Sequence, residues 1–173
     1  LMNKISKKTG FSLLEVMVAL SLLVITISST MALIANSFNV VTEAKNKIIA
    51  RYLAQEAIEY VRKVRDDQAY ENKWLKNPLI IGADIGVDVY DNVVGDIKPC
   101  GFMNQCILTY DSLTGEYSHD NSFPNTIFTR KINIDEIQSN IEAIVTVRML
   151  WQHKGTAKNF LLTEHIFNYK IIP

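Results

Sequence analysis

Residues 7–20 read KKTGFSLLEVMVAL, and this stretch decides how the rest of the chain is interpreted. Two lysines and a glycine precede a long apolar run that contains one carboxylate, Glu15, near its start. No charged residue follows from 16 to 42, so a helix over these 27 residues would be roughly 40 Å long and could cross a hydrocarbon core of about 30 Å. The lysines before the run predict a cytoplasmic N-terminus and an exported remainder.

Three simpler interpretations of the apolar run each leave an observation unexplained. A buried helix of a soluble protein would be shorter and less uniformly apolar. A secretory signal peptide needs a small-x-small cleavage site, and the nearest candidate, at 30–32, is poor. A plain membrane anchor accounts for the length and orientation but not for Glu15, because a carboxylate at the membrane edge is costly and usually has a positive partner.

The basic leader, the Gly10-Phe11 junction, Glu15 and the apolar run together resemble the class III signal of type IV pilins and type II secretion pseudopilins. The resemblance implies that prepilin peptidase cuts after Gly10, that Phe11 becomes the N-methylated first residue, and that Glu15 is the fifth residue of the mature chain. It also implies a structural subunit, with no enzyme activity and no cofactor. The expected partners are membrane lipid, other pilin or pseudopilin subunits, and an inner-membrane assembly platform. The expected location is a single pass through the inner membrane before assembly, then a periplasmic or extracellular filament.

The charge on Glu15 has a physical explanation within such a filament. The α-amine that cleavage frees on Phe11 carries positive charge at neutral pH. In a bundle of these helices, Glu15 of one subunit pairs with the Phe11 amine of a neighbour, which fixes the stagger between subunits. Many pilins have a Pro or Gly about twenty residues into the mature chain, but residues 25–32 contain neither. Their Ser and Thr side chains compete for backbone hydrogen bonds and soften the helix slightly.

The segment 37–67 is predicted to continue as an amphipathic helix. One stripe of apolar residues recurs every three or four positions, which predicts packing on a sheet. Its members are Ile49, Leu53, Ala57, Tyr60 and Val64. The helix is expected to end at 66–67, and the stretch 53–66 resembles the helix end of some bacterial minor pilins.

Strand-like alternation replaces the helical period after Pro78. It is found at 85–89, 106–110 and 126–134, and the strongest hairpin joins 141–152 to 157–169 through a turn at 153–155. A long N-terminal helix followed by such strands predicts an α+β fold with an antiparallel sheet on the helix, a pilin-like architecture. The predicted organisation is a leader at 1–10, a membrane and filament-core helix at 11–36, an amphipathic helix at 37–67 and an exported sheet domain at 68–173.

Cys100 and Cys106 enclose five residues in the part of the chain expected to be exported. A disulfide that closes this short loop is the favoured interpretation. A metal site would need further ligands, and only His119 lies near in sequence. A redox pair is disfavoured because the spacing is not C-x-x-C.

Other chemistry-bearing residues point to no site. The loop aspartates Asp84, Asp88, Asp91 and Asp96 lack EF-hand spacing, so they are interpreted as solvated residues rather than calcium ligands. The histidines fall in no catalytic motif. Without the leader, 15 basic and 18 acidic side chains remain, and the pair at 130–131 is a thin basic patch, so nucleic acid is not favoured as a partner. Two alternatives stay open: a filament-tip binding module (an adhesin or DNA-uptake receptor) and a single-pass anchored exported domain.

Overall fold

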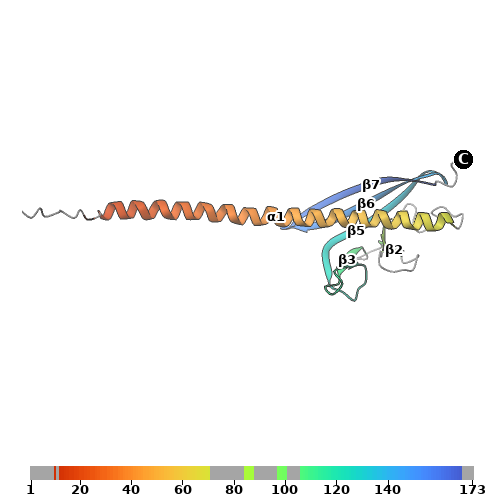
Figure 1. Ribbon diagram of the computed structural model, residues 1–173, viewed down its shortest axis with the longest axis horizontal. Coiled ribbons are helices and arrows are strands. Elements are labelled where there is room, and N and C mark those ends of the chain that lie inside the picture. The colour runs from red at the N-terminus through yellow and green to blue at the C-terminus, as the bar shows by residue number, and fades with distance from the viewer. Residues whose placement is uncertain (1–9, 11, 71–83, 88–96, 101–105, 169–173) are drawn as a thin grey trace, which may run out of the picture. The chain divides into compact units, whose positions relative to one another are not determined.

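The computed structural model describes residues 10, 12–70, 84–87, 97–100 and 106–168. These residues form one helix and seven strands, in the order α1 (Leu13–Tyr70), β1 (Ile85–Val87), β2 (Ile97–Pro99), β3 (Ile107–Tyr110), β4 (Tyr117–Ser118), β5 (Asn125–Gln138), β6 (Glu142–His153) and β7 (Thr156–Phe167) (Figure 1). The chain divides into two compact units, Leu1–Ala44 and Lys45–Pro173. Helix α1 contributes to both units, and every strand belongs to the second.

Helix α1 is one uninterrupted element of 58 residues. No Gly or Pro occurs within it, and every turn therefore keeps its backbone donor and a side chain compatible with helical geometry. The predicted end at 66–67 is three residues short, since the helix continues to Tyr70. The polar residues after Arg65 are adequate helix formers, so polarity alone does not end the helix.

All strand pairs in the sheet are antiparallel, and β5 is its central strand. One edge of β5 pairs with β6, which pairs in turn with β7 over twelve uninterrupted positions. Both β1 and β3 pair with the other edge, β1 at Ile132 and β3 between Asn125 and Thr129. Strands β2 and β4 extend β1 and β3 outward.

The predicted α+β arrangement, a long N-terminal helix packed on an antiparallel sheet, is confirmed. The strongest predicted hairpin corresponds to β6 and β7, whose turn places Lys154 and Gly155 at φ values of 50° and 74°. Two successive left-handed residues suit the right-handed twist of a tight hairpin. Strands β2 and β4 were not predicted, and the part of the predicted first strand beyond 87 lies outside the described residues.

The hydrophobic core lies between α1 and the inner face of the sheet, where both elements bury one stripe of side chains. The helix buries residues at helical spacing and each long strand buries alternate residues. The largest contributors from the strands are Ile85, Leu108, Phe128, Ile132, Ile134, Val145, Val147, Met149, Trp151 and Ile166, and those from the helix are Leu53, Ile58, Tyr60, Val61 and Val64. The stripe predicted for 37–67 is buried except at Ile49, which is half-buried.

Arg130 is a charged residue inside this core. It lies at an inward position of β5, is 0% exposed, and donates from Nη1 to Glu56 Oε2 at 2.7 Å and to the Leu53 carbonyl at 3.2 Å. The inference of a basic surface patch at 130–131 is therefore wrong, because the alternation of β5 sends Arg130 inward and Lys131 outward. Instead, Arg130 joins the middle of the sheet to the helix.

Strand β7 contacts the helix through two further arginines. Arg62 binds Glu164 through Nε and Nη2, and it also binds Glu59 on its own helix. The hydrogen bond to Glu164 raises the pKa of Arg62 above its ordinary value. The Arg51 guanidinium lies over the Phe160 ring, 5.6 Å from its centroid. These contacts hold β7, at the edge of the sheet, against α1, which Arg130 contacts from the central strand β5.

Candidate assembly segment

Gly10 is exposed, and a Cβ atom built on it would meet nothing within 4 Å. Its φ angle is also outside the left-handed region. Neither packing nor backbone conformation within this chain therefore requires glycine at this position. Phe11, the other residue of the junction, lies outside the described residues.

The first turn of α1 is formed on Ser12. The Ser12 carbonyl accepts hydrogen bonds from the backbone N–H of Glu15, at 3.0 Å, and of Val16, at 3.2 Å. Ser12 is thus the N-cap residue, with Glu15 at the third helical position, the S-x-x-E spacing of a capping box. The sequence interpretation of Glu15 missed this feature, although the spacing was visible. Glu15 stands where the helix dipole favours a negative charge.

The Glu15 side chain is exposed, and within the described part of the chain no side chain is recorded as its partner. A carboxylate in a first helical turn gains about 0.3–1 kcal/mol from the dipole. A charged side chain costs about 2.5–3.5 kcal/mol at a bilayer centre and less toward the membrane edge. A carboxylate that enters an apolar environment is therefore stabilised further by a nearby cation.

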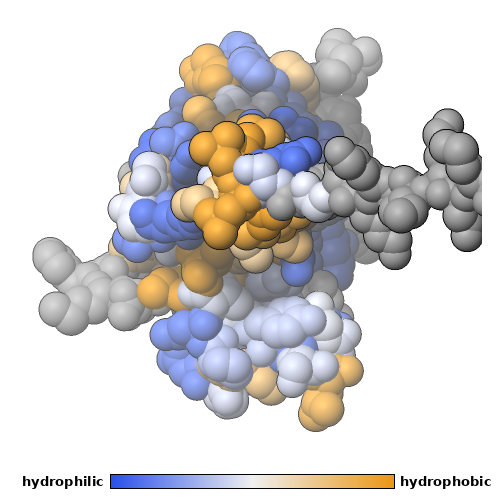
Figure 2. Space-filling view, turned by 90° about the vertical axis from the view of Figure 1, so that its left-hand side faces the viewer, coloured by the Kyte–Doolittle hydropathy of each residue, from blue (hydrophilic) through white to orange (hydrophobic). Residues whose placement is uncertain are grey.

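The apolar side chains around and after Glu15 are not buried against any described part of the chain. Every Leu, Ile, Val, Met and Phe side chain from Leu13 to Val41 is at least 46% exposed. Figure 2 shows hydrophobic side chains gathered over the N-terminal part of α1. Each such side chain is worth about 1.5–3 kcal/mol when fully buried. Among the described residues, α1 is the one helix long and apolar enough to cross a membrane, and its apolar window is unburied. Lipid or the apolar surface of a protein would bury these side chains favourably.

The hydroxyl groups along the apolar segment are satisfied by the helix itself. Seven Ser and Thr side chains donate to carbonyls three or four residues earlier, namely Ser21, Thr26, Ser28, Ser29, Thr30, Ser37 and Thr42. The helix is continuous through 26–30, where Ser and Thr are concentrated and neither Pro nor Gly occurs. Because these donors are paired within the helix, the segment can enter an apolar environment without exposing unpaired hydroxyls.

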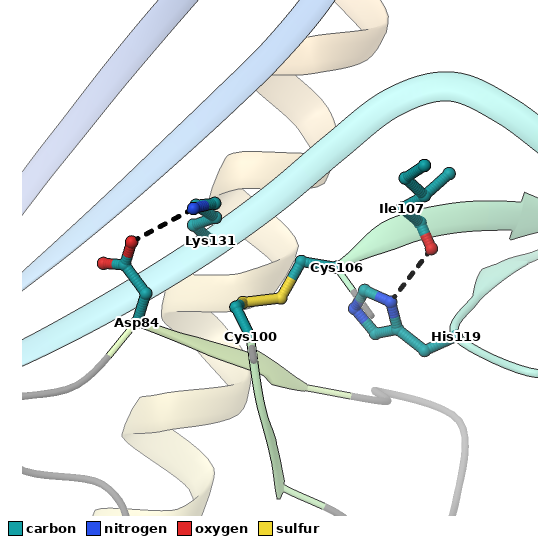
Figure 3. Close-up of a disulfide and its surroundings, with 6 residues drawn as sticks. All are labelled: Asp84, Cys100, Cys106, Ile107, His119 and Lys131. Carbon is teal, nitrogen blue, oxygen red and sulfur yellow. Dashed lines mark hydrogen bonds and ion pairs between the residues drawn. A yellow bond between two sulfur atoms is a disulfide. The ribbon is translucent and has the colours of Figure 1, made fainter. Parts of the chain in front are cut away.

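The two cysteines lie in the second compact unit. The structure joins Cys100 and Cys106 through a disulfide, with their Cα atoms 5.5 Å apart (Figure 3). Cys106 is buried and Cys100 is half-buried. The two backbones are also anchored, since the Cys100 N–H donates to the Asp84 carbonyl at 2.8 Å and the Cys106 carbonyl accepts from the Arg130 N–H at 2.9 Å. The bridge therefore connects the end of β2 with the start of β3.

The remaining candidates are dispersed over this unit. His119 is buried, with Nδ1 3.2 Å from the Ile107 carbonyl (Figure 3), whereas the exposed His165 contacts Glu142 at 2.6 Å. Asp84 pairs with Lys131 at 3.3 Å, and the other three aspartates considered for calcium lie outside the described residues. Within the described ranges, no group of three or more metal-ligating side chains converges.

Comparison with known proteins gives one match, and it falls on the N-terminal segment. Residues 5–35 match the family model for the prokaryotic N-terminal methylation motif. This range contains Gly10, Phe11, Glu15 and most of the exposed apolar helix. No curated protein and no solved structure matches the chain.

Proposed function

We propose that this chain, a precursor with the class III signal of type IV pilins and pseudopilins, is a minor subunit that assembles into a filament through its N-terminal helix. Proteins with this motif are structural subunits processed by prepilin peptidase. One observation carries the proposal: Glu15 lies in the first turn of an apolar helix whose N-terminal half is exposed among the described residues. The resemblance of 53–66 to the helix end of minor pilins supports the minor role.

The proposed division of labour follows the chain. Residues 1–10 are a leader that is removed, and 11–36 cross the inner membrane and later form the filament core. Residues 37–67 carry the sheet domain, and 68–173 belong to the exported domain. The unit from Lys45 onward has its own buried core, whereas the continuous run of exposed apolar side chains belongs to the preceding unit. This contrast supports an anchor followed by an independently packed head.

In the proposed mechanism, Glu15 sets the register between subunits. After cleavage and N-methylation, the Phe11 amine of a neighbouring subunit supplies the cation that Glu15 lacks within its own described helix. Pairing two charges in a low dielectric is favourable only when both are well positioned, so a subunit at the wrong height is disfavoured. The surrounding apolar side chains contribute non-directional attraction, and the ion pair contributes the specific stagger.

Mass spectrometry of the membrane-extracted protein tests the processing step. Co-expression with a prepilin peptidase should give a chain that begins at N-methylated Phe11. Gly10→Val should remain at full length, because a branched side chain blocks the approach that Gly10 leaves open, while membrane insertion is retained. A chain cut elsewhere, or a Gly10→Val variant cut normally, would refute the proposed junction.

Co-purification with companion subunits tests the assembly step. Glu15→Gln keeps the size and polarity of the side chain but removes its charge, so insertion should hold or improve while association with partner subunits falls by about tenfold or more. Glu43→Gln is the matched control, because it removes a carboxylate at the other end of the uncharged run. Normal incorporation of Glu15→Gln, or equal loss in the control, would contradict the register role.

A further inference from the structure

Among the described residues, few non-covalent contacts hold the β1–β2 pair to the sheet. Strand β1 contributes one ladder position to β5, Ile85 opposite Ile132, while β5 and β6 share nine such positions. Within the described ranges, this side also forms the ion pair between Asp84 and Lys131, at 3.3 Å. Both side chains are about a third or more exposed, so water screens this pair. Ile85 itself is 1% exposed and belongs to the core.

The disulfide lies where this hold is weakest. It joins Cys100, directly after β2, to Cys106, directly before β3. Strands β1 and β3 pair with the same edge of β5 at neighbouring positions, Ile132 and Thr129. The bridge therefore connects the two strand pairs across the gap between them, as Figure 3 shows beside Asp84 and Lys131. Because Cys106 is itself bonded to the backbone of Arg130, the bridge ends on the central strand.

We propose that the Cys100–Cys106 disulfide is a redox-controlled clip that fastens β1 and β2 to the sheet. In the dithiol form this strand pair detaches, while α1, β5, β6 and β7 remain folded. Ordering the residues of this strand pair costs backbone entropy, which one ladder position, a screened ion pair and the burial of the single side chain of Ile85 do not offset. The α1–β5–β6–β7 platform does not depend on the clip, because the Arg62–Glu164 contact and the continuous β6–β7 ladder involve neither cysteine nor its hydrogen-bond partners.

The chemistry of the clip is ordinary thiol–disulfide exchange. To open it, an external dithiol attacks the half-buried Cys100 sulfur, and Cys106 leaves as a thiolate that takes up a proton. The second thiol of the reagent then displaces Cys100, so the reagent ends as a disulfide and both cysteines end as thiols. Closure is the reverse reaction with an oxidant disulfide. A chain that reaches an oxidising compartment would therefore acquire β1 and β2 after its platform has folded.

Hydrogen–deuterium exchange on the full chain in detergent micelles tests the clip. Reduction with dithiothreitol should lower the protection of 85–87 and 97–99 on the order of thirtyfold, the effect expected for losing closure of a short loop, and should leave 142–167 unchanged. The Cys100→Ser/Cys106→Ser variant should reproduce this pattern without reductant and should not respond to it.

Three outcomes would overturn the proposal. Loss of protection throughout β5, β6 and β7 would make the disulfide a support of the whole fold. Unchanged protection at β1 and β2 would show that the ladder and Ile85 hold them unaided. Detachment in Lys131→Ala with the disulfide intact would assign the fastening to the ion pair.

Discussion

The buried pair of Arg130 and Glu56 gives the sharpest prediction for the stability of the head domain. Arg130 is fully buried, and its recorded charged partner is Glu56, whose side chain is 24% exposed. Removing one partner of a fully buried pair costs about 3–5 kcal/mol, and the partial exposure of Glu56 places Glu56→Ala at the lower end, about 3 kcal/mol. Glu59→Ala is the matched control, because Glu59 is 66% exposed in its ion pair and should cost less than about 1 kcal/mol.

A double-mutant cycle separates the contribution of the ion pair to the free energy of unfolding from the contribution of side-chain packing. Arg130→Met removes the buried cation with a side chain of similar length, so the double variant Arg130→Met/Glu56→Gln should lie within about 1.5 kcal/mol of the parent. The assay is urea unfolding followed by the fluorescence of Trp151, which is 5% exposed and packs near Phe128, in a Trp74→Phe background. A loss below about 1 kcal/mol for Glu56→Ala, or no coupling in the cycle, would refute the claim that this pair holds sheet to helix.

Three other perturbations have defined outcomes. Burial raises the pKa of Tyr117, with a further contribution from Tyr110, so the folded state keeps the phenol proton at pH values where the unfolded chain loses it. Stability should therefore fall as the pH rises above the ordinary value of 10.0, and unfolding titrations should show a shallower fall for Tyr117→Phe. Lys154→Asn should raise the thermal midpoint by stabilising the head by about 0.5 kcal/mol, because Asn tolerates the left-handed conformation better than Lys; an unchanged midpoint would count against this explanation of the turn. Leu108→Ala, at a residue 0% exposed, should cost about 3 kcal/mol in urea unfolding, and a loss under 1 kcal/mol would remove Leu108 from the core.

The parts of the fold that repeat a period were predictable from the sequence. The stripe on α1 and the alternation in β6 and β7 each persist over many residues, so the helix, the hairpin and the α+β class followed from them. Strands β2 and β4 have three and two residues, too few to show a period, and their existence depends on pairing with β1 and β3. Arg130 was misjudged because a charged residue is rarely fully buried, and its partners Glu56 and Leu53 on the helix lie 74 and 77 positions away in the sequence.

In the candidate site, too, features formed by neighbouring residues could be predicted from the sequence, whereas features that depend on distant strands could not. Gly10, Glu15 and the apolar run form a local pattern, which a family model also matches over 5–35. The capping position of Ser12 was equally local but was overlooked, because Glu15 was considered only for its distant partner. The placement of the disulfide across two strand pairs required the strand order, which the sequence did not contain.

The polar contacts of α1 with β5 and β7 join residues that are far apart in the sequence, and this affects how the newly made chain folds. The helix is synthesised first. Its contact with β5, between Glu56 and Arg130, needs a residue made 74 positions later, and its contact with β7, between Arg62 and Glu164, needs one made 102 positions later. Until β7 emerges, the sheet that covers the apolar stripe of the helix is incomplete, and a growing chain exposes part of this stripe to solvent or to other proteins. The entropy of closing such long loops grows slowly with length, so the delay costs time more than stability. Truncation within β7 should therefore harm the yield of folded protein out of proportion to the few side chains removed.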